Sequence, residues 1–311
     1  MRNTCLNEVH QLARKNKNII FIGSDLGAGT LASMKEEMPD RFFMEGISEQ
    51  HIIGMSAGLA MEGFIPYINS IAPFLTRRCY EQVLVDLCLH DLPVRLIGNG
   101  GGAVYAPLGP THLAVEDIAI FRAIPNMTIV APCDAQEMLR FMPKTVDWPH
   151  PIYIRLAKGG DKVVSKSDLG FEIGKAILMR QPKDGLFITT GVMTQKALEA
   201  SEQLLELGIE CGVLHMHTIK PLDHASLENL IPKVNAVVTI EEHFRIGGLG
   251  SAVLESCSDL IPKHVSKITR IGIPDQFSDK YGSQESLLEY WGITVESIKN
   301  TMLQKLKNEL N

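Results

Sequence analysis

The sequence has no apolar run long enough to cross a membrane, since none reaches the ~18 uninterrupted residues that a spanning helix needs. Residues 1–6 show no hydrophobic core of a signal peptide, so we expect a cytoplasmic protein. The six cysteines are scattered without a CxxC pair, which argues against a disulfide framework or a zinc site. A net charge of −6 gives no reason to expect nucleic acid or an anionic membrane as a partner.

Familiar phosphate-binding and nucleophile motifs are also missing, because the sequence contains no Walker A lysine loop and no GxSxG turn. Residues 98–103 match the weak GxGxxA pattern of dinucleotide-binding proteins. That pattern requires a helix to begin within it, and Pro107 and Pro110 prevent a helix there. We therefore do not expect a nicotinamide site.

What the sequence does contain is a repeated alternation of short apolar runs and amphipathic segments. In the first half, strands are expected at residues 18–23, 64–69, 94–98, 127–131 and 152–155. Residues 157–170 are polar and rich in Gly, Lys and Asp, which is typical of a linker, and a second alternation follows. The pattern predicts an α/β protein whose two domains are each a mostly parallel sheet flanked by helices. We place the first domain at 1–158, the linker at 159–172 and the second domain at 173–311.

Two histidines, His215 and His217, stand one residue apart on a predicted strand and would share one face of it. With no third ligand nearby in the sequence, we interpret them as structural residues rather than metal ligands. The same interpretation applies to residues 241–243 (Glu-Glu-His) at the end of another predicted strand.

Residues 44–61 run from a predicted strand through a Gly-containing turn into a helix that is apolar nearly all round and should be buried. Small residues such as Gly54 and Gly58 would let this helix approach a neighbour closely. Its first residue is expected near Ser48, followed by Glu49. A carboxylate at the start of a buried helix is either a first-turn residue favoured by the helix dipole or a proton-transfer group with a tuned pKa.

A series of short segments stands in a fixed order along the chain: residues 46–51, 69–77, 108–112, 116–119, 122–127, 218–223 and 247–251. Together they resemble the carboxyl-terminal two-thirds of transketolase and of the related deoxyxylulose-phosphate synthase. In that family these segments belong to a pyrimidine-binding module and a C-terminal module. The resemblance covers essentially the whole chain and implies a thiamine diphosphate-dependent enzyme.

The resemblance also implies something that this chain lacks. In the family, a separate module marked by a GDG sequence holds the diphosphate and its Mg²⁺, and no GDG occurs here. The chain therefore resembles one subunit of a split transketolase, and we expect no metal ligands in it. A partner subunit would carry the diphosphate module, in an assembly of two chains of each type.

By resemblance, Glu49 is the acid that hydrogen-bonds the aminopyrimidine ring of the cofactor and promotes formation of its carbanion. Phe74, Arg77 and Tyr80 would surround that ring, as ring-face stacking suits these residue types. For Phe74, simple core packing is the alternative.

The same resemblance implies that three further residues meet the substrate. His112 would contact its hydroxyl and carbonyl oxygens. Arg155 would bind a sugar phosphate, and the alternative is a salt bridge at the end of the strand. Asp25 would lie in the substrate channel, or act as a turn residue.

Three departures from the family pattern concern the substrate. Leu108 stands where transketolases carry an Asp that contacts a substrate hydroxyl, Gly29 replaces a phosphate-contacting serine, and residues 100–102 replace the surroundings of a phosphate-contacting histidine. A leucine cannot hydrogen-bond a hydroxyl group. Modified or deoxy sugars would therefore fit this pocket.

The activity favoured by the sequence is transfer of a two-carbon ketol unit from a ketose donor to an aldehyde acceptor. The alternatives are a subunit of a deoxyxylulose-phosphate-synthase-like enzyme, a 2-oxo acid dehydrogenase beta-like subunit, and a non-catalytic scaffold subunit.

Overall fold

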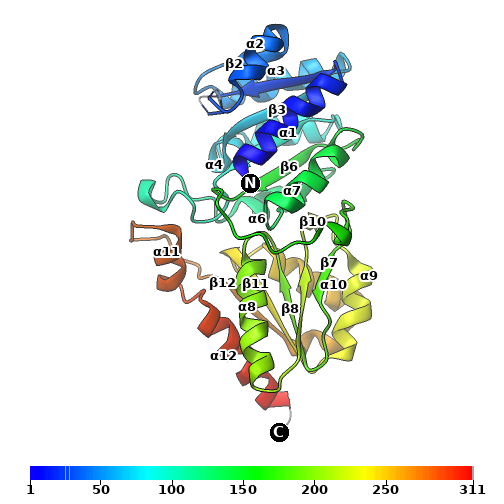
Figure 1. The fold of residues 1–311 in the computed structure, drawn as a ribbon, viewed down its shortest axis with the longest axis vertical. Coiled ribbons are helices and arrows are strands. Elements are labelled where there is room, and N and C mark those ends of the chain that lie inside the picture. Colours follow the sequence, from blue (N-terminus) through cyan, green and yellow to red (C-terminus); the bar gives the residue numbers. More distant parts are fainter. Residues whose placement is uncertain (25, 28, 310–311) are drawn as a thin grey trace.

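The computed structural model describes residues 1–24, 26–27 and 29–309. Asp25, which was predicted to lie in the substrate channel, falls outside the described residues. The molecule is elongated, with the amino-terminal half above the carboxyl-terminal half along the long axis (Figure 1). Each half is a mostly parallel sheet flanked by helices, which confirms the predicted fold class.

The first sheet has, within the described residues, the strand order β10-β5-β6-β4-β3-β1-β2. All neighbours are parallel except β10, which runs antiparallel to β5. The strands are β1 (Ile19–Gly23), β2 (Phe42–Met44), β3 (Ile65–Ile71), β4 (Arg95–Asn99), β5 (Thr128–Val130), β6 (Ile152–Leu156) and β10 (Thr218–Lys220). The residues of β10 were predicted to belong to the second domain.

Helices cover both faces of this sheet. They are α1 (Arg2–Lys15), α2 (Ala32–Glu37), α3 (Glu49–Met61), α4 (Ala72–Thr76), α5 (Tyr80–Gln82), α6 (Asp117–Arg122) and α7 (Ala135–Phe141). A π-helical segment, Val83–Cys88, follows α5, and short 3₁₀ turns lie at Pro39–Arg41, Ala106–Leu108, Met142–Thr145 and Ser167–Leu169.

The second sheet has the order β12-β11-β8-β9-β7, with β7 antiparallel to β9 and the other neighbours parallel. Its strands are β7 (Ile177–Arg180), β8 (Gly185–Thr189), β9 (Cys211–His215), β11 (Ala236–Phe244) and β12 (Ile268–Ile273). Its helices are α8 (Met193–Glu206), α9 (His224–Leu230), α10 (Leu249–Leu260), α11 (Gln284–Tyr290) and α12 (Val295–Glu309). Two 3₁₀ turns lie at Ile231–Lys233 and Pro262–Lys267.

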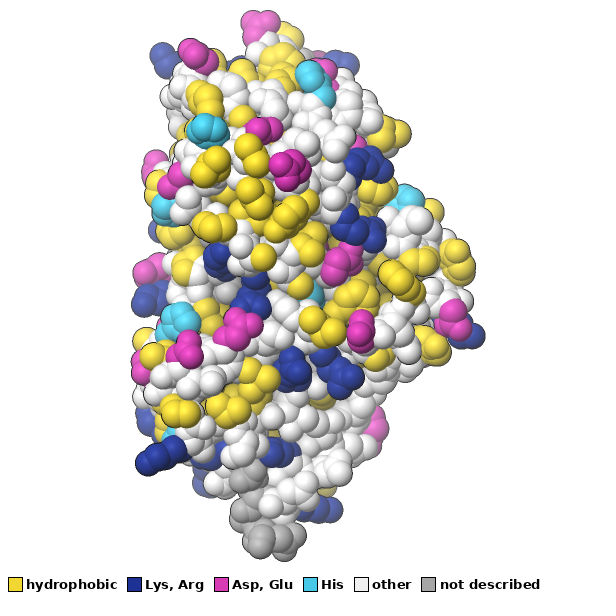
Figure 2. All heavy atoms as spheres, turned by 180° about the vertical axis from the view of Figure 1, so that it is seen from behind, with side chains coloured by type: hydrophobic (Ala, Val, Ile, Leu, Met, Phe, Trp, Pro, Cys, Tyr) yellow, Lys and Arg dark blue, Asp and Glu magenta, His cyan; other side chains and the backbone are white. Residues whose placement is uncertain are grey.

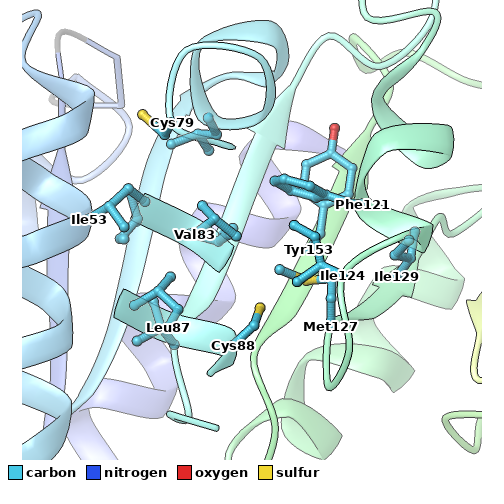
Figure 3. Packing of buried hydrophobic residues seen from close by; sticks show 14 of the residues in the cluster. Ile53, Cys79, Val83, Leu87, Cys88, Phe121, Ile124, Met127, Ile129 and Tyr153 are labelled. Carbon is cyan, nitrogen blue, oxygen red and sulfur yellow. The ribbon is translucent and has the colours of Figure 1, made fainter. Parts of the chain in front are cut away.

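Each face of each sheet has its own hydrophobic core. On the first sheet, α3, the π-helical segment and α6 share one core, whereas α1 and α7 share the core on the opposite face. Figure 3 shows the first of these, with Ile53 of α3 facing Val83 and Leu87 of the π-helical segment. Phe121 meets Tyr153 edge-on, with ring centroids 5.1 Å apart. These contacts fix α3 and α6 against the strands whose ends carry the candidate site.

Only one side of α3 is buried within the chain. Ile52, Ile53 and Ala57 face the sheet, whereas Gly54 and Gly58 are exposed. The prediction that this helix is buried thus holds for one face, and the small residues line the other. In the face seen from behind, apolar side chains gather over the upper half of the molecule (Figure 2). An apolar helix with an exposed stripe of small residues suits close packing against another chain.

Candidate active site

Glu49 is the first residue of α3 and is almost fully buried, with 1% of its surface exposed. Its position follows from the chain just before it, because Gly46 turns with φ +66° and the Ser48 hydroxyl donates to the carbonyl of Glu45 at 2.6 Å. Glu49 Oε1 accepts a hydrogen bond from Ser70 Oγ at 2.9 Å, at the end of β3. The structure therefore places a shielded carboxylate at the carboxyl edge of the sheet, where ligands bind in open α/β folds.

The second oxygen of Glu49 contacts an arginine that the sequence reasoning missed. Arg78 Nη1 donates to Glu49 Oε2 at 2.6 Å, and the Arg78 guanidinium carbon lies 4.0 Å from the centroid of the Phe74 ring. The Arg78 side chain is 40% exposed, so it covers this carboxylate from the solvent side. Phe74 lies in α4, and Arg78 lies in the turn that follows this helix.

Phe74 and His112 meet on the other side of this group. Their ring centroids are 5.2 Å apart with an interplanar angle of 68°. His112 Nδ1 is 2.8 Å from Thr111 Oγ1, which fixes the imidazole on its loop. Glu49, Phe74 and His112, which were predicted together, therefore form one contiguous group with Arg78.

Arg77 contacts Glu116 and the loop that carries His112. Its Nε lies 3.0 Å from Glu116 Oε1, and its Nη2 donates to the carbonyl of Thr111 at 2.9 Å. Arg77 thus supports the loop that carries His112. Tyr80 packs partly buried against the core on this side of the sheet and, with Arg77, lines a shallow hollow beside α6.

Arg155 lies at the end of β6 in a buried ion pair. Its Nε donates to Asp117 Oδ2 at 2.7 Å, and its Nη2 donates to the carbonyls of Ala114 and Glu242 at 2.9 Å each. Burial alone would lower the pKa of Arg155, but Asp117, together with Tyr153 and Glu242, outweighs burial and raises it, so the guanidinium stays charged. This is the strand-end salt bridge considered as the alternative, and phosphate binding by Arg155 stays a prediction.

The glycine-rich loop after β4 serves the contact between the domains. Glu242 Oε1 accepts from the backbone N–H of Ala103 at 2.8 Å. A Cβ on Gly102, where φ is +74°, would lie 2.3 Å from Glu242 Cδ. His243 adds a second link, since its Nε2 accepts from the Ala119 N–H at 3.2 Å. The segment 98–103 is therefore a docking surface for β11.

A cavity of about 390 Å³ lies at the seam between the domains, beside the loop that carries His112. Its walls are mostly apolar and come from Arg77, Pro110, Leu113, Val115, Glu116, Phe244, Gln276, Phe277, Ser278 and Trp291. Leu108, on the same loop, is 50% exposed. Gly29 is open enough that a Cβ there would meet nothing within 4 Å, so the missing serine side chain is not excluded by crowding.

Among the helices of the described residues, none combines the length and apolar character needed to cross a bilayer.

Comparison with known proteins shows the family to which the chain belongs. The family model of the transketolase pyrimidine-binding domain matches residues 1–160, and that of the transketolase C-terminal domain matches residues 174–298. The chain is 35% identical over 300 residues to a subunit of the apulose-4-phosphate transketolase of Phocaeicola vulgatus, covering 96% of this chain and 94% of that protein. It is 33% identical over 299 residues to the 6-deoxy-6-sulfo-D-fructose transketolase subunit SqwH of Clostridium sp. (strain MSTE9), covering 96% and 92%.

A solved structure described as a split gene transketolase in an inactive beta4 tetramer matches with a TM-score of 0.89 and 32% identity, over 98% of both chains. The two family models follow each other along the chain in the order of the two sheets. This chain belongs to the transketolase family and consists of its pyrimidine-binding and C-terminal parts.

Proposed function

We propose that this chain is the C-terminal subunit of a two-subunit, thiamine diphosphate-dependent transketolase. It transfers a two-carbon ketol unit from a ketose donor to an aldehyde acceptor, and it acts only with an N-terminal partner subunit. The observation that carries the proposal is the buried carboxylate of Glu49 beside the aromatic face of Phe74, with His112 next to it. Relatives named as transketolase subunits of similar length support the split arrangement.

The residues present fit the aminopyrimidine end of the cofactor, which supplies the carbanion chemistry when bound. Glu49 is shielded from water and held by Ser70, so its carboxyl group is positioned to hydrogen-bond a ring nitrogen. Phe74 offers a ring face for stacking. His112 stands on a loop beside that face and can donate a hydrogen bond to a substrate oxygen.

Arg78 adds a condition to this mechanism. Its guanidinium donates a hydrogen bond to Glu49 Oε2 and lies over the face of the Phe74 ring. A ring that stacks on this face and hydrogen-bonds Glu49 would compete with the Arg78 guanidinium for both contacts. We expect Arg78 to move when the cofactor binds.

The partner is proposed to hold the diphosphate and Mg²⁺, because this chain contains no GDG sequence. The exposed side of α3 next to Glu49, with Gly54 and Gly58 on it, is the surface proposed for packing against another subunit. We expect two chains of each type in the active assembly.

The substrate is proposed to be a modified sugar or sugar phosphate. The Leu108 side chain has no group that could hydrogen-bond the hydroxyl next to the aldehyde of a substrate. Two relatives are named for such sugars, apulose 4-phosphate and 6-deoxy-6-sulfofructose. Turnover of ribose 5-phosphate equal to that of a full-length transketolase would contradict this part of the proposal.

Calorimetry of thiamine diphosphate with Mg²⁺ tests the proposal, with this chain alone and with its co-expressed partner. We expect no binding by the chain alone and tight binding by the pair. Glu49→Gln should lower kcat about 100- to 10,000-fold without changing assembly. Glu62→Gln, at the exposed opposite end of α3, is the matched control. Unchanged turnover of the Glu49 variant would favour a scaffold subunit, and turnover with a 2-oxo acid donor would favour the synthase.

A further inference from the structure

A second group of chemistry-bearing side chains lies between the two domains, on the face of the first sheet opposite α3. Cys133 and Glu137 stand at the start of α7, and His215 ends β9 of the second sheet. All three are fully buried. The Cys133 sulfur, a Glu137 carboxylate oxygen and a ring nitrogen of His215 all lie within 4.8 Å of one another.

Local structure explains how Cys133 and Glu137 come together. Asp134 is the N-cap of α7 and accepts from the Glu137 N–H at 2.8 Å. This turn brings the Glu137 side chain back over Cys133, whose N–H donates to Glu137 Oε2 at 2.6 Å. The second domain supplies His215, whose Nε2 lies 2.9 Å from the same oxygen.

Both nearby histidines are oriented in the way that metal ligands usually are. His215 Nδ1 lies 2.8 Å from Thr194 Oγ1, and His217 Nδ1 lies 2.9 Å from Thr218 Oγ1. A hydrogen bond to one ring nitrogen fixes the ring and leaves the other nitrogen for a metal. In each ring that other nitrogen is Nε2. Among the described residues His217 Nε2 has no hydrogen-bond partner, whereas His215 Nε2 faces Glu137 Oε2, and the two ring centroids are 5.8 Å apart.

Two atoms of this group are unsatisfied. Among the described residues, Glu137 Oε1 and His217 Nε2 are buried and have no hydrogen-bond partner. Buried polar atoms without partners are uncommon, and each calls for an explanation such as an ion. Here one is a carboxylate oxygen and the other an imidazole nitrogen, which are both donors to metals.

We propose that Cys133, Glu137 and His215 bind one Zn²⁺ ion, with His217 as the fourth ligand, and that the ion ties the two domains together. Sulfur and imidazole ligands select zinc over Mg²⁺ or Ca²⁺, which prefer oxygen. In a tetrahedral zinc site the ligand atoms lie roughly 3.5 Å apart, so the ligand atoms of Cys133, Glu137 and His215 must approach one another by about 1 Å. His217 lies outside this group of three, so its ring must also move toward the ion. This ion is separate from the Mg²⁺ of the proposed function and does not depend on it.

Binding releases one proton for each ion. The Cys133 thiol loses its proton to solvent as the zinc–sulfur bond forms. His215 exposes its Nε2 lone pair by moving the ring proton to Nδ1. Thr194 Oγ1, which also lies 2.8 Å from Thr189 Oγ1, can accept from Nδ1 after this change by turning its own hydroxyl proton to Thr189.

The proposal changes the interpretation of His215 and His217 as structural residues. That interpretation depended on finding no third ligand nearby in the sequence. The fold supplies Cys133 and Glu137 from the other domain, about 80 residues earlier in the chain.

The test uses the full chain, purified without a histidine tag, and measures zinc content and Co²⁺ binding. We expect one zinc per chain and, after exchange, the near-ultraviolet charge-transfer band of a cobalt thiolate. Cys133→Ser should remove the band, whereas Cys257→Ser, a buried cysteine in the second domain, should retain it. Mg²⁺ in excess should not displace the metal.

Thr194→Val provides a second readout, because it keeps every ligand and removes only the hydroxyl that orients His215. We expect its Kd for zinc to rise about 10- to 100-fold in competition with a chromophoric chelator. This variant decides the question if Cys133→Ser fails to fold. A wild-type chain without bound zinc or a cobalt band, or equal zinc affinity in the Thr194 variant, would overturn the proposal.

Discussion

Replacing Arg155 by methionine separates the two roles considered for this side chain, binding of a substrate phosphate and structural ion pairing. The Arg155 guanidinium makes two contacts with the Asp117 carboxylate, at 2.7 and 3.3 Å. It also donates to the carbonyls of Ala114 and Glu242. Since Glu242 belongs to β11, Arg155 joins the first domain to the second.

The expected loss of stability follows from burial. Arg155 is 7% exposed and Asp117 is fully buried, so solvent screens the pair little. Methionine would fill the space of the aliphatic stem but leave the Asp117 charge with the Tyr153 hydroxyl, at 2.7 Å, as its remaining side-chain partner among the described residues. Removing one partner of a buried ion pair costs about 3–5 kcal/mol. Domains are stable by only ~5–15 kcal/mol, so Arg155→Met should lose a large share of the free energy of unfolding.

Urea unfolding of the isolated chain measures this loss. Arg14→Met is the control, because Arg14 pairs with Glu37 on the surface and both side chains are exposed, so we expect little change. Adding Asp117→Asn to Arg155→Met should recover part of the loss, since it removes the unpaired charge. A variant within about 1 kcal/mol of the wild type, together with a raised KM for phosphorylated sugars, would refute the structural role and favour phosphate binding.

Three further predictions concern other parts of the chain. Arg78→Ala should tighten thiamine diphosphate binding by the assembled enzyme, because the cofactor no longer displaces a cation from Glu49 and Phe74; weaker binding in calorimetry would mean that Arg78 itself holds the cofactor. Gly58→Ala should stabilise the isolated chain by about 0.5–1 kcal/mol, since its Cβ meets nothing within 4 Å, yet weaken assembly on a sizing column if α3 packs against another subunit. Burial lowers the pKa of His243 from 6.5 to about 4, so the stability this residue contributes is complete above about pH 6.5 and is lost as pH falls towards 4. The loss amounts to at most about 3 kcal/mol. Urea unfolding from pH 7.5 to 4.5 should therefore show a steeper fall for the wild type than for His243→Gln, and parallel curves would contradict this reasoning.

Local periodicity was sufficient to predict the strands of the first half, since short apolar runs bounded by glycine and polar residues are what buried parallel strands require. It was not sufficient for β10. Residues 218–220 pair antiparallel with β5, about 90 residues earlier in the chain. That pairing depends on where the second domain docks, which the local sequence does not encode.

The candidate site was also predicted only in part. The ordered resemblance pointed to Glu49, Phe74 and His112, which the structure brings together. It pointed to Arg77 as the arginine of the group, whereas Arg78 is the one that lies over Phe74. Spacing along the chain could not distinguish them, because residues three and four apart both lie near one face of a helix and α4 ends at Thr76, before either arginine. Gly102 needed a long-range contact, with Glu242 of the second domain, to be understood.

The contacts of Arg78 also connect cofactor binding with subunit assembly. A buried carboxylate without an opposite charge is costly, and in the single chain Arg78 supplies that charge from the solvent side. A cofactor that takes over Glu49 must offset the loss of this ion pair. The pyrimidine-binding residues alone make few contacts that could offset this loss. A second subunit that holds the diphosphate and covers the exposed side of α3 would contribute additional binding free energy. We therefore expect cofactor and partner to bind with positive coupling, so that thiamine diphosphate lowers the Kd of the two subunits. An affinity between the subunits that is the same with and without cofactor would show that Arg78 does not link the two events.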